Sequence, residues 1–133
     1  MPQTITTGYK ALVDAAKSEI TEYSVEQVVA MKDDPNVVIV DIRDPRELDR
    51  DGRISGAVHC PRGMLEFWID PESPYHKAVF ADDKQYIFFC AGGLRSALAA
   101  KTAQDMGLQP VAHMLGGFGA WKKSGAPVQT SKA

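Results

Sequence analysis

The chain has 133 residues, of which 44% are hydrophobic and 24% are charged, so its length and composition fit one compact soluble domain with a single core. Fifteen Lys and Arg against seventeen Asp and Glu give a formal net charge of -2, which argues against binding to nucleic acid or to an anionic membrane. No apolar run is long enough for a membrane helix, and the first residues lack the basic-then-apolar order of a secretory signal. We therefore expect a cytoplasmic protein with no nucleic-acid or membrane partner.

Helices and a buried strand are predicted in the first part of the chain. Apolar residues at helical spacing predict an amphipathic helix over residues 9–20. Ser24 offers an N-cap to a second helix, which Asp34-Pro35 ends. The next segment, Val37–Asp41, carries β-branched residues without polar alternation, which predicts a strand buried on both faces of a parallel sheet.

The second part of the chain continues the alternation of strand and helix. Another buried strand is predicted at residues 86–90, and weaker strand candidates lie at 57–60 and 111–115. An Ala- and Leu-rich helix is expected over 94–106, where Gly107 stops it. We therefore predict a single α/β domain with a mainly parallel central sheet, helices on both faces, and a ligand site beyond the carboxyl ends of the strands.

The loop that begins at Cys90 lies where the second buried strand must turn into a helix. Gly92 and Gly93 permit backbone angles closed to other residues, so we expect successive amide groups to form an anion nest around the Cys90 sulfur. The helix N-terminus and Arg95 would add positive charge, and such surroundings favour the thiolate form of a cysteine. We predict that Cys90 is a nucleophile. The other residues of the predicted substrate-binding loop are Ala91, Gly92, Gly93, Leu94 and Ser96.

A lone cysteine at the end of a core strand is usually a small buried hydrophobic residue. For Cys90, the coincidence of strand end, paired glycines, helix start and arginine favours the functional interpretation. Cys60 has no such setting, since Pro61 follows it, and we interpret it as structural. Reduced thiols are favoured for both cysteines, with a single bridge between them as the alternative.

Four ordered motifs extend across the chain. They are Cys90-x-x-Gly93-x-Arg95, the strand end Asp41-x-Arg43, the segment Gly52-Arg-Ile-Ser-Gly56-Ala57, and Gly116-Gly117-Phe118-x-Ala120-Trp121 with the residues up to Val128. Together they resemble the motifs of single-domain rhodaneses, in the rhodanese-like sulfurtransferase family. The resemblance divides the chain into an N-terminal helical extension (1–20), a rhodanese-like domain (21–128) and a frayed tail (129–133).

The resemblance implies sulfurtransferase activity of the thiosulfate:cyanide type. Cys90 would take a sulfane sulfur from a donor such as thiosulfate or a persulfide, hold it as a persulfide, and yield it to cyanide, a thiol or a protein cysteine. The loop amides would stabilise this intermediate through fixed dipoles, and Arg95 would orient an anionic donor. Small-molecule donors and acceptors, and a protein thiol or persulfide, are the implied partners, and no cofactor is implied.

Several other side chains have weaker claims to the site. Asp41 and Arg43 follow a buried strand, and support of the neighbouring loops is favoured over catalysis. Arg62 is favoured as a second contact for an anionic donor. Phe67 or Trp68 would form pocket walls, although a helix that packs its aromatic residues into the core explains them equally well.

The remaining polar residues suggest no separate site. The three histidines share no metal-ligand spacing with each other or with the cysteines, so we infer no metal and expect His113, like the others, to be an ordinary hydrogen-bonded side chain. The mixed charges of residues 43–53 are interpreted as solvated loop surface. Gly116-Gly117 lacks the Lys-Ser/Thr pair of a phosphate-binding loop and is interpreted as the start of a helix.

Two other functions compete with sulfur transfer. Cysteine-dependent phosphatases and arsenate reductases resemble a pattern of Cys, five residues and Arg, whereas four residues separate Cys90 from Arg95 here. The tighter ring suits one extra sulfur atom better than a phosphate, and no Asp that could act as a loop acid stands out. The other alternative is a non-catalytic or sulfur-relay binding module, and an intact loop with its cysteine favours the enzyme.

Overall fold

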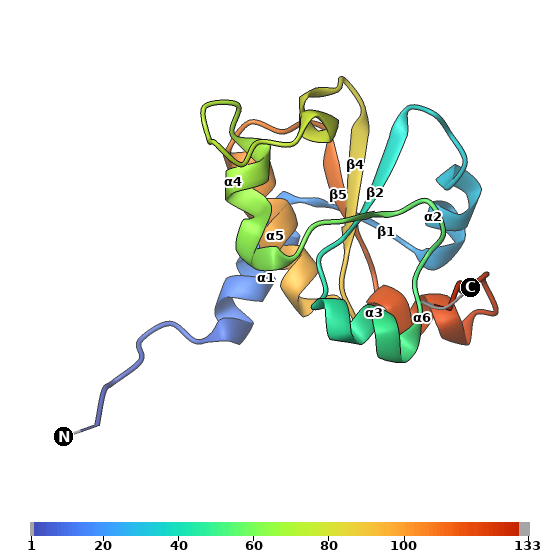
Figure 1. The fold of residues 1–133 in the computed structure, drawn as a ribbon. Helices are drawn as coiled ribbons and strands as arrows, with labels where there is room; N and C mark the ends of the chain where they lie inside the picture. Colours follow the sequence, from blue (N-terminus) through green and yellow to red (C-terminus); the bar gives the residue numbers. More distant parts are fainter. Residues whose placement is uncertain (1, 131–133) are drawn as a thin grey trace.

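The computed structural model describes residues 2–130, which form a five-stranded parallel sheet with helices on both faces (Figure 1). The strands are β1 (Thr21–Tyr23), β2 (Val37–Asp41), β3 (Val58–His59), β4 (Gln85–Phe89) and β5 (Val111–Met114). Their spatial order is β1-β5-β4-β2-β3, and every neighbouring pair runs parallel. The predicted α/β class is therefore confirmed, and the carboxyl ends of the strands share one edge of the sheet.

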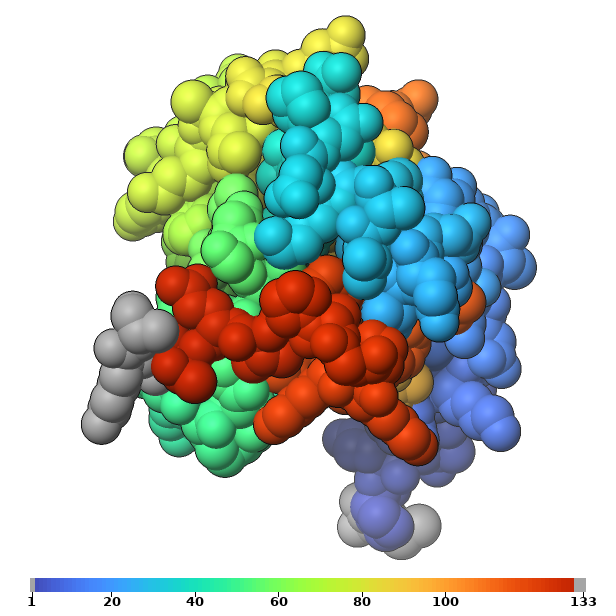
Figure 2. Space-filling model, turned by 90° about the vertical axis from the view of Figure 1, so that its right-hand side faces the viewer, coloured from blue at the N-terminus to red at the C-terminus, as the bar shows by residue number. Residues whose placement is uncertain are grey.

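The helices divide between the two faces of the sheet. Their bounds are α1 (Tyr9–Glu19), α2 (Val25–Met31), α3 (Pro45–Asp51), α4 (Leu65–Ile69), α5 (Leu94–Asp105) and α6 (Gly117–Lys123), with short 3-10 turns η1 (Arg62–Met64) and η2 (Ala78–Ala81). One core layer packs α4 and α5 against the sheet, and α1 packs on α5. The other layer packs α2 and α6 against the opposite face, and Figure 2 shows the C-terminal segment lying beside α2 on that side.

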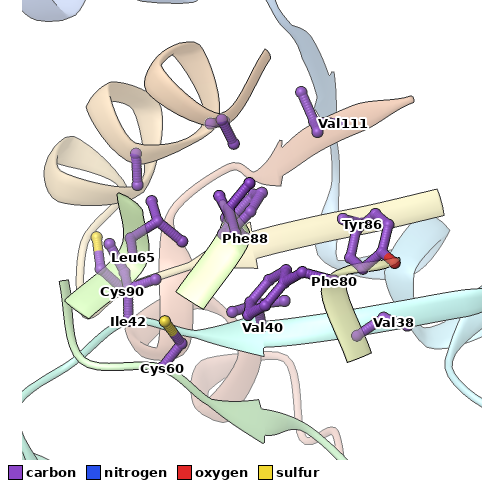
Figure 3. Packing of buried hydrophobic residues seen from close by; sticks show 14 residues of the cluster. Val38, Val40, Ile42, Cys60, Leu65, Phe80, Tyr86, Phe88, Cys90 and Val111 are labelled. Carbon is purple, nitrogen blue, oxygen red and sulfur yellow. The ribbon is translucent and has the colours of Figure 1, made fainter. Parts of the chain in front are cut away.

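Small residues bring α5 close to the sheet. Ala99, Ala100 and Ala103 are buried against the layer that contains Val40 and Phe88 (Figure 3). Alanine has high helix propensity and leaves little bulk between a helix and its neighbour. The axis of α5 can therefore lie directly against β4, which fixes the start of the helix at the end of that strand.

A capped helix occupies residues that the sequence analysis assigned to a solvated loop. Asp44 caps the N-terminus of α3, Pro45 starts its first turn, and Glu47 completes the capping box by accepting from the Asp44 amide. The helix ends at Gly52, whose φ is 94°. The interpretation of residues 43–53 as loop surface was wrong because the capping signals outweigh the high charge density.

The predicted strand boundaries differ at their ends from those observed. The strand expected at 86–90 begins one residue earlier and ends at Phe89, so Cys90 already belongs to the loop. The candidate at 57–60 shortens to the two residues of β3. Sequence analysis missed β1, because Thr-Glu-Tyr is a short polar segment that becomes a strand only by pairing with β5 at the edge of the sheet.

Segments near both ends of the described residues contact the central domain. The helix α1, inside the predicted extension, buries Val13 and Ala16 against Ala97 of α5. Gln129 forms an antiparallel bridge with Arg53, and residues 131–133 of the predicted tail lie outside the described residues. The division at residues 20 and 128 stays a prediction. Within residues 2–130, no helix combines the length and apolar character needed to cross a bilayer.

A buried ion pair joins β2 to the end of α3. Arg43 donates to the Asp41 carboxylate through Nε at 3.0 Å and through Nη2 at 2.8 Å, and the same Nη2 donates to the Gly52 carbonyl at 2.8 Å. The guanidinium carbon lies 4.1 Å from the ring centroid of Phe118 in α6. Both charged side chains are buried, so the pair connects the strand end, α3 and α6 without contact with water.

We predict that Arg43→Leu lowers the free energy of unfolding by about 3–5 kcal/mol, because it leaves the Asp41 carboxylate buried without its partner. Urea unfolding followed by circular dichroism measures the change. Arg50→Ala is the matched control, since it breaks the exposed Arg50–Asp51 pair and should have a much smaller effect. Equal stability of Arg43→Leu and wild type would contradict a structural role for the buried pair.

Candidate active site

The loop between β4 and α5 points two backbone amides at one sulfur atom. Gly93, with φ of 103°, turns the chain into α5 and donates its N–H to Cys90 Sγ at 3.1 Å. The Ser96 amide in the first turn of α5 donates to the same atom at 3.4 Å. These two groups and the positive end of the helix place partial positive charge around the sulfur.

Only one of the two loop glycines uses the conformational freedom of glycine. Gly93 has a positive φ, whereas Gly92 does not, so only Gly93 uses the backbone angles that the sequence permits at both positions. A side chain at Gly92 would also meet open space. Among the predicted nest residues, Gly92 and Leu94 are exposed, while Ser96 is buried beside the sulfur.

The first turn of α6 holds the base of this loop. The Phe118 amide donates to the Cys90 carbonyl at 2.7 Å, and the Gly119 amide donates to the Ala91 carbonyl at 3.0 Å. Gly117, with φ of 61°, permits this approach, since a Cβ at that position would overlap the Cys90 carbonyl oxygen. Gly116-Gly117 therefore starts a helix, as interpreted from the sequence, and that helix fixes the orientation of Cys90.

Cys90 is only 1% exposed, so its sulfur lies at the floor of the loop. In Figure 3, Cys90 lies near Ile42 and Leu65 at one end of the core layer, with Cys60 nearby. The sulfur is therefore covered by surrounding protein atoms.

The second cysteine has a different environment. Cys60 is free and buried, and burial raises the pKa of its thiol to about 12. Cys60 is therefore protonated at neutral pH and a poor nucleophile. Cys90 is free as well, which confirms the prediction of reduced thiols.

Arg95 is fixed beside the loop by a carboxylate of α3. Its two terminal nitrogens each donate to a different oxygen of Glu47 at 2.9 Å. This pairing, followed by the charge of Cys90, raises the pKa of Arg95. An open cleft of about 540 Å³ borders the pair and is lined by Asp44, Arg46, Glu47, Arg50 and Arg95. Glu47 is a site residue that the sequence analysis missed, although its capping-box spacing from Asp44 was a usable signal.

The segment that follows β3 carries Arg62, Phe67 and Trp68, the residues with weaker predicted roles in the site. Arg62 Nη1 donates to Glu66 Oε1 at 2.9 Å, four residues later. Phe67 is 51% exposed and meets Tyr75 edge to face, whereas Trp68 packs against the core layer. Trp68 is therefore part of the core packing, whereas Phe67 lies at the surface. The contact of Arg62 with a donor stays a prediction.

A line of polar side chains extends from the sulfur to the edge of the sheet. Ser96 Oγ lies 3.6 Å from Cys90 Sγ and 3.0 Å from His113 Nδ1, and His113 Nε2 lies 2.8 Å from Glu22 Oε2. His113 is thus hydrogen-bonded through both ring nitrogens, as expected of an ordinary histidine, whereas Glu22 was not among the predicted residues. The signal for His113 was its position inside an apolar strand, because a buried polar group requires partners. No cluster of residues suited to a metal ion occurs within 2–130.

Comparison with known proteins gives concordant matches over most of the chain. The family described as rhodanese-like domain matches residues 24–124. Thiosulfate sulfurtransferase GlpE of Shewanella oneidensis is 33% identical over 82% of this chain and 99% of its own, and a sulfurtransferase of Allochromatium vinosum is 29% identical over 84% and 94%. A solved structure from Rhodopseudomonas palustris CGA009, described as a protein of unknown function and possible tyrosine phosphatase, is 61% identical over 97% and 99% of the chains, with a TM-score of 0.94.

The ion pair between Arg95 and Glu47 predicts a lowered pKa for the Glu47 carboxyl. Arg95 lowers the pKa of Glu47 from 4.5 to about 2, so the stabilisation from this shift is fully present above pH 4.5 and is lost as the pH falls toward 2. NMR titration of the Glu47 carboxyl should show this value in wild type and a rise toward 4.5 in Arg95→Gln. Arg46→Gln leaves the pair intact and should leave the pKa near 2. A wild-type pKa close to 4.5 would refute the ion pair.

Proposed function

Because the chain belongs to the rhodanese-like domain family, we propose that it is a sulfurtransferase that works through a persulfide on Cys90. The observation that carries the proposal is the pair of amides, from Gly93 and Ser96, that converge on the sulfur at the end of β4. Converging backbone donors stabilise negative charge without a side-chain acid or base. Both the thiolate and the persulfide carry such a charge.

The proposed reaction has two displacement steps. The Cys90 thiolate attacks the outer sulfur of the donor, so a new S–S bond forms while the bond between that sulfur and the rest of the donor breaks. With thiosulfate as donor, sulfite leaves with the electron pair of the broken bond. An acceptor such as cyanide or a thiolate then attacks the outer sulfur of the persulfide, and Cys90 leaves as the thiolate.

Arg95 supplies the positive charge for an anionic donor. Glu47 accepts from both terminal nitrogens of Arg95, which holds the guanidinium in one position beside the loop. The residues between Cys90 and Arg95 are Ala91, Gly92, Gly93 and Leu94, all of them neutral. With one loop cation, we propose that the donors include persulfides as well as thiosulfate, that a protein thiol or persulfide can act as partner, and that the reaction takes place in the reducing cytoplasm.

A cysteine-dependent phosphatase is the second candidate, because the similar structure from Rhodopseudomonas palustris is described as a possible tyrosine phosphatase. Such an enzyme must hold a tetrahedral phosphate above the thiolate and protonate the leaving oxygen. Four residues between Cys90 and Arg95 form a short loop, and the two donors found at the sulfur suit a single bound sulfur atom. Sulfur transfer is therefore the preferred function.

The central test is sulfur transfer by purified protein with thiosulfate and cyanide, measured as thiocyanate. We expect Cys90→Ser to abolish turnover, because the persulfide cannot form, and Cys60→Ser to retain it, because the Cys60 thiol stays protonated. Parallel assays with mercaptopyruvate, glutathione persulfide and a cysteine-desulfurase system identify the donor class. Wild-type turnover by Cys90→Ser with any donor would refute the role of Cys90.

The same proteins distinguish the two candidate enzymes and the binding module. We expect no Cys90-dependent turnover of p-nitrophenyl phosphate or arsenate, and we expect a mass gain on Cys90 after donor treatment that cyanide reverses. Reversal separates a persulfide from sulfinic acid, which has nearly the same mass and is irreversible. Phosphate-ester turnover that depends on Cys90 would favour the phosphatase, and an unmodified Cys90 with every donor would favour the module.

A further inference from the structure

The polar line behind Cys90 joins the β4–α5 loop to α5 and to the strands β5 and β1. Cys90 follows β4, Ser96 lies in α5, His113 lies in β5 and Glu22 lies in β1. Ser96 is 0% exposed and His113 is 1% exposed, whereas the Glu22 side chain is 26% exposed. We propose that Ser96 passes the thiol proton of Cys90 to His113, which Glu22 holds in the orientation needed to accept it.

The donors and acceptors that these side chains offer determine the direction of each hydrogen bond in the line. An ionised Glu22 can only accept, so His113 Nε2 must carry the hydrogen of the 2.8 Å bond between them. In the neutral imidazole, Nδ1 then has a lone pair and accepts the hydroxyl hydrogen of Ser96 at 3.0 Å. The Ser96 oxygen is left to accept from the Cys90 thiol at 3.6 Å, a distance compatible with the larger radius of sulfur. Every hydrogen in the chain therefore points away from the sulfur.

This arrangement permits a balanced proton transfer. The S–H bond of Cys90 breaks as an O–H bond forms on Ser96, while the original Ser96 proton moves to His113 Nδ1. The products are a thiolate and an imidazolium, with the Ser96 hydroxyl donating to the thiolate and both imidazolium N–H groups donating to neighbours. No oxidant, reductant or further reactant is needed.

The surrounding charges support the imidazolium. Glu22 contributes the carboxylate at Nε2, and Lys17 of α1 lies 3.7 Å from the same carboxylate oxygen. The facing group from α5 is Ser96, and β4 pairs the apolar Phe88 with His113 in the sheet. The other titratable groups are Cys90 and, beyond it, Arg95, whose charge interacts with the sulfur.

The same charge arrangement serves the whole proposed cycle, and in this respect the inference rests on the proposed function. A thiolate and a persulfide each carry one negative charge, so the imidazolium can balance both without moving the proton again. His113 acts through Ser96 and does not touch the reacting sulfur, so it is a positioning residue in this reaction. The hydrogen-bonded line also explains why a histidine occurs in the buried strand β5, whose other residues, Val111, Ala112 and Met114, are apolar.

The test is the pH dependence of Cys90 alkylation by iodoacetamide in the full chain, followed by mass spectrometry of the peptide that contains Cys90. His113→Asn can still hydrogen-bond to Ser96 but cannot take up a proton. We expect alkylation at pH 7 to slow by about tenfold or more, because a smaller fraction of Cys90 is thiolate, and the midpoint of the pH–rate profile to rise. Above the midpoint the rates of variant and wild type should converge, which a general loss of structure would not produce.

Three further variants and one control test the proposal even if His113→Asn does not fold. Ser96→Ala breaks the chain and should raise the midpoint in the same way, whereas Ser96→Thr keeps a hydroxyl and should restore it toward wild type. Glu22→Gln, at the edge strand, should give a smaller shift in the same direction. His59→Asn is the matched control. His59 contacts the Arg43 carbonyl and is not part of the hydrogen-bonded line from Cys90 to Glu22, so this variant should leave the profile unchanged.

The outcomes separate this inference from the proposed function. Wild-type profiles for both folded Ser96→Ala and folded His113→Asn, as judged by thermal unfolding, would overturn the proton transfer even if the protein moves sulfur through Cys90. A midpoint that rises in these variants, in a protein that transfers no sulfur from any donor, would support the proton transfer and refute the sulfurtransferase proposal.

Discussion

The convergence of two backbone amides on the Cys90 sulfur is the contact on which the site depends. The sulfur accepts from Gly93 and Ser96 because the strand β4 ends one residue before the cysteine and the helix α5 begins four residues after it. Amides fixed by a helix do not reorganise when charge develops, so they stabilise an anion more effectively than mobile water. The rest of the fold serves to hold this turn in place.

Backbone hydrogen bonds, helix packing and a buried ion pair stabilise this turn. The first turn of α6 donates to the carbonyls of the loop, and the absence of a side chain at Gly117 permits that approach. The small residues of α5 let the helix lie against the sheet, so its N-terminus meets the end of β4. The buried pair of Arg43 and Asp41 joins β2 to α3, which in turn presents Glu47 to the arginine of the loop. The charges of the site are thus held by backbone and by paired side chains.

The sequence prediction was wrong for residues 43–53 and incomplete for Gly92 and His113. Residues 43–53 have a loop-like charge density, yet the capping box of Asp44 and Glu47 and the proline at the first turn make residues 45–51 helical. Gly92 resembles its neighbour in sequence, but the chain turns only at Gly93. His113 has the hydrogen bonds expected of an ordinary buried histidine, but spacing along the chain carries no information about its serine partner on another element. For His113 the missing information was therefore which segment lies beside it, whereas the capping signals at Asp44, Pro45 and Glu47 are local.

Local patterns along the chain predict the alternation of strands and helices, the parallel sheet and the cysteine loop at a strand end, because hydrophobic period, capping residues and glycine turns act over a few neighbouring positions. They also predict that the two cysteines are free. Which charges meet at the site depends on the folded arrangement, since Glu47 and Arg95 are 48 residues apart and Glu22 and His113 are 91 apart. Such partners are brought together by strand order and helix packing, which depend on the burial of the whole core and not on any local pattern.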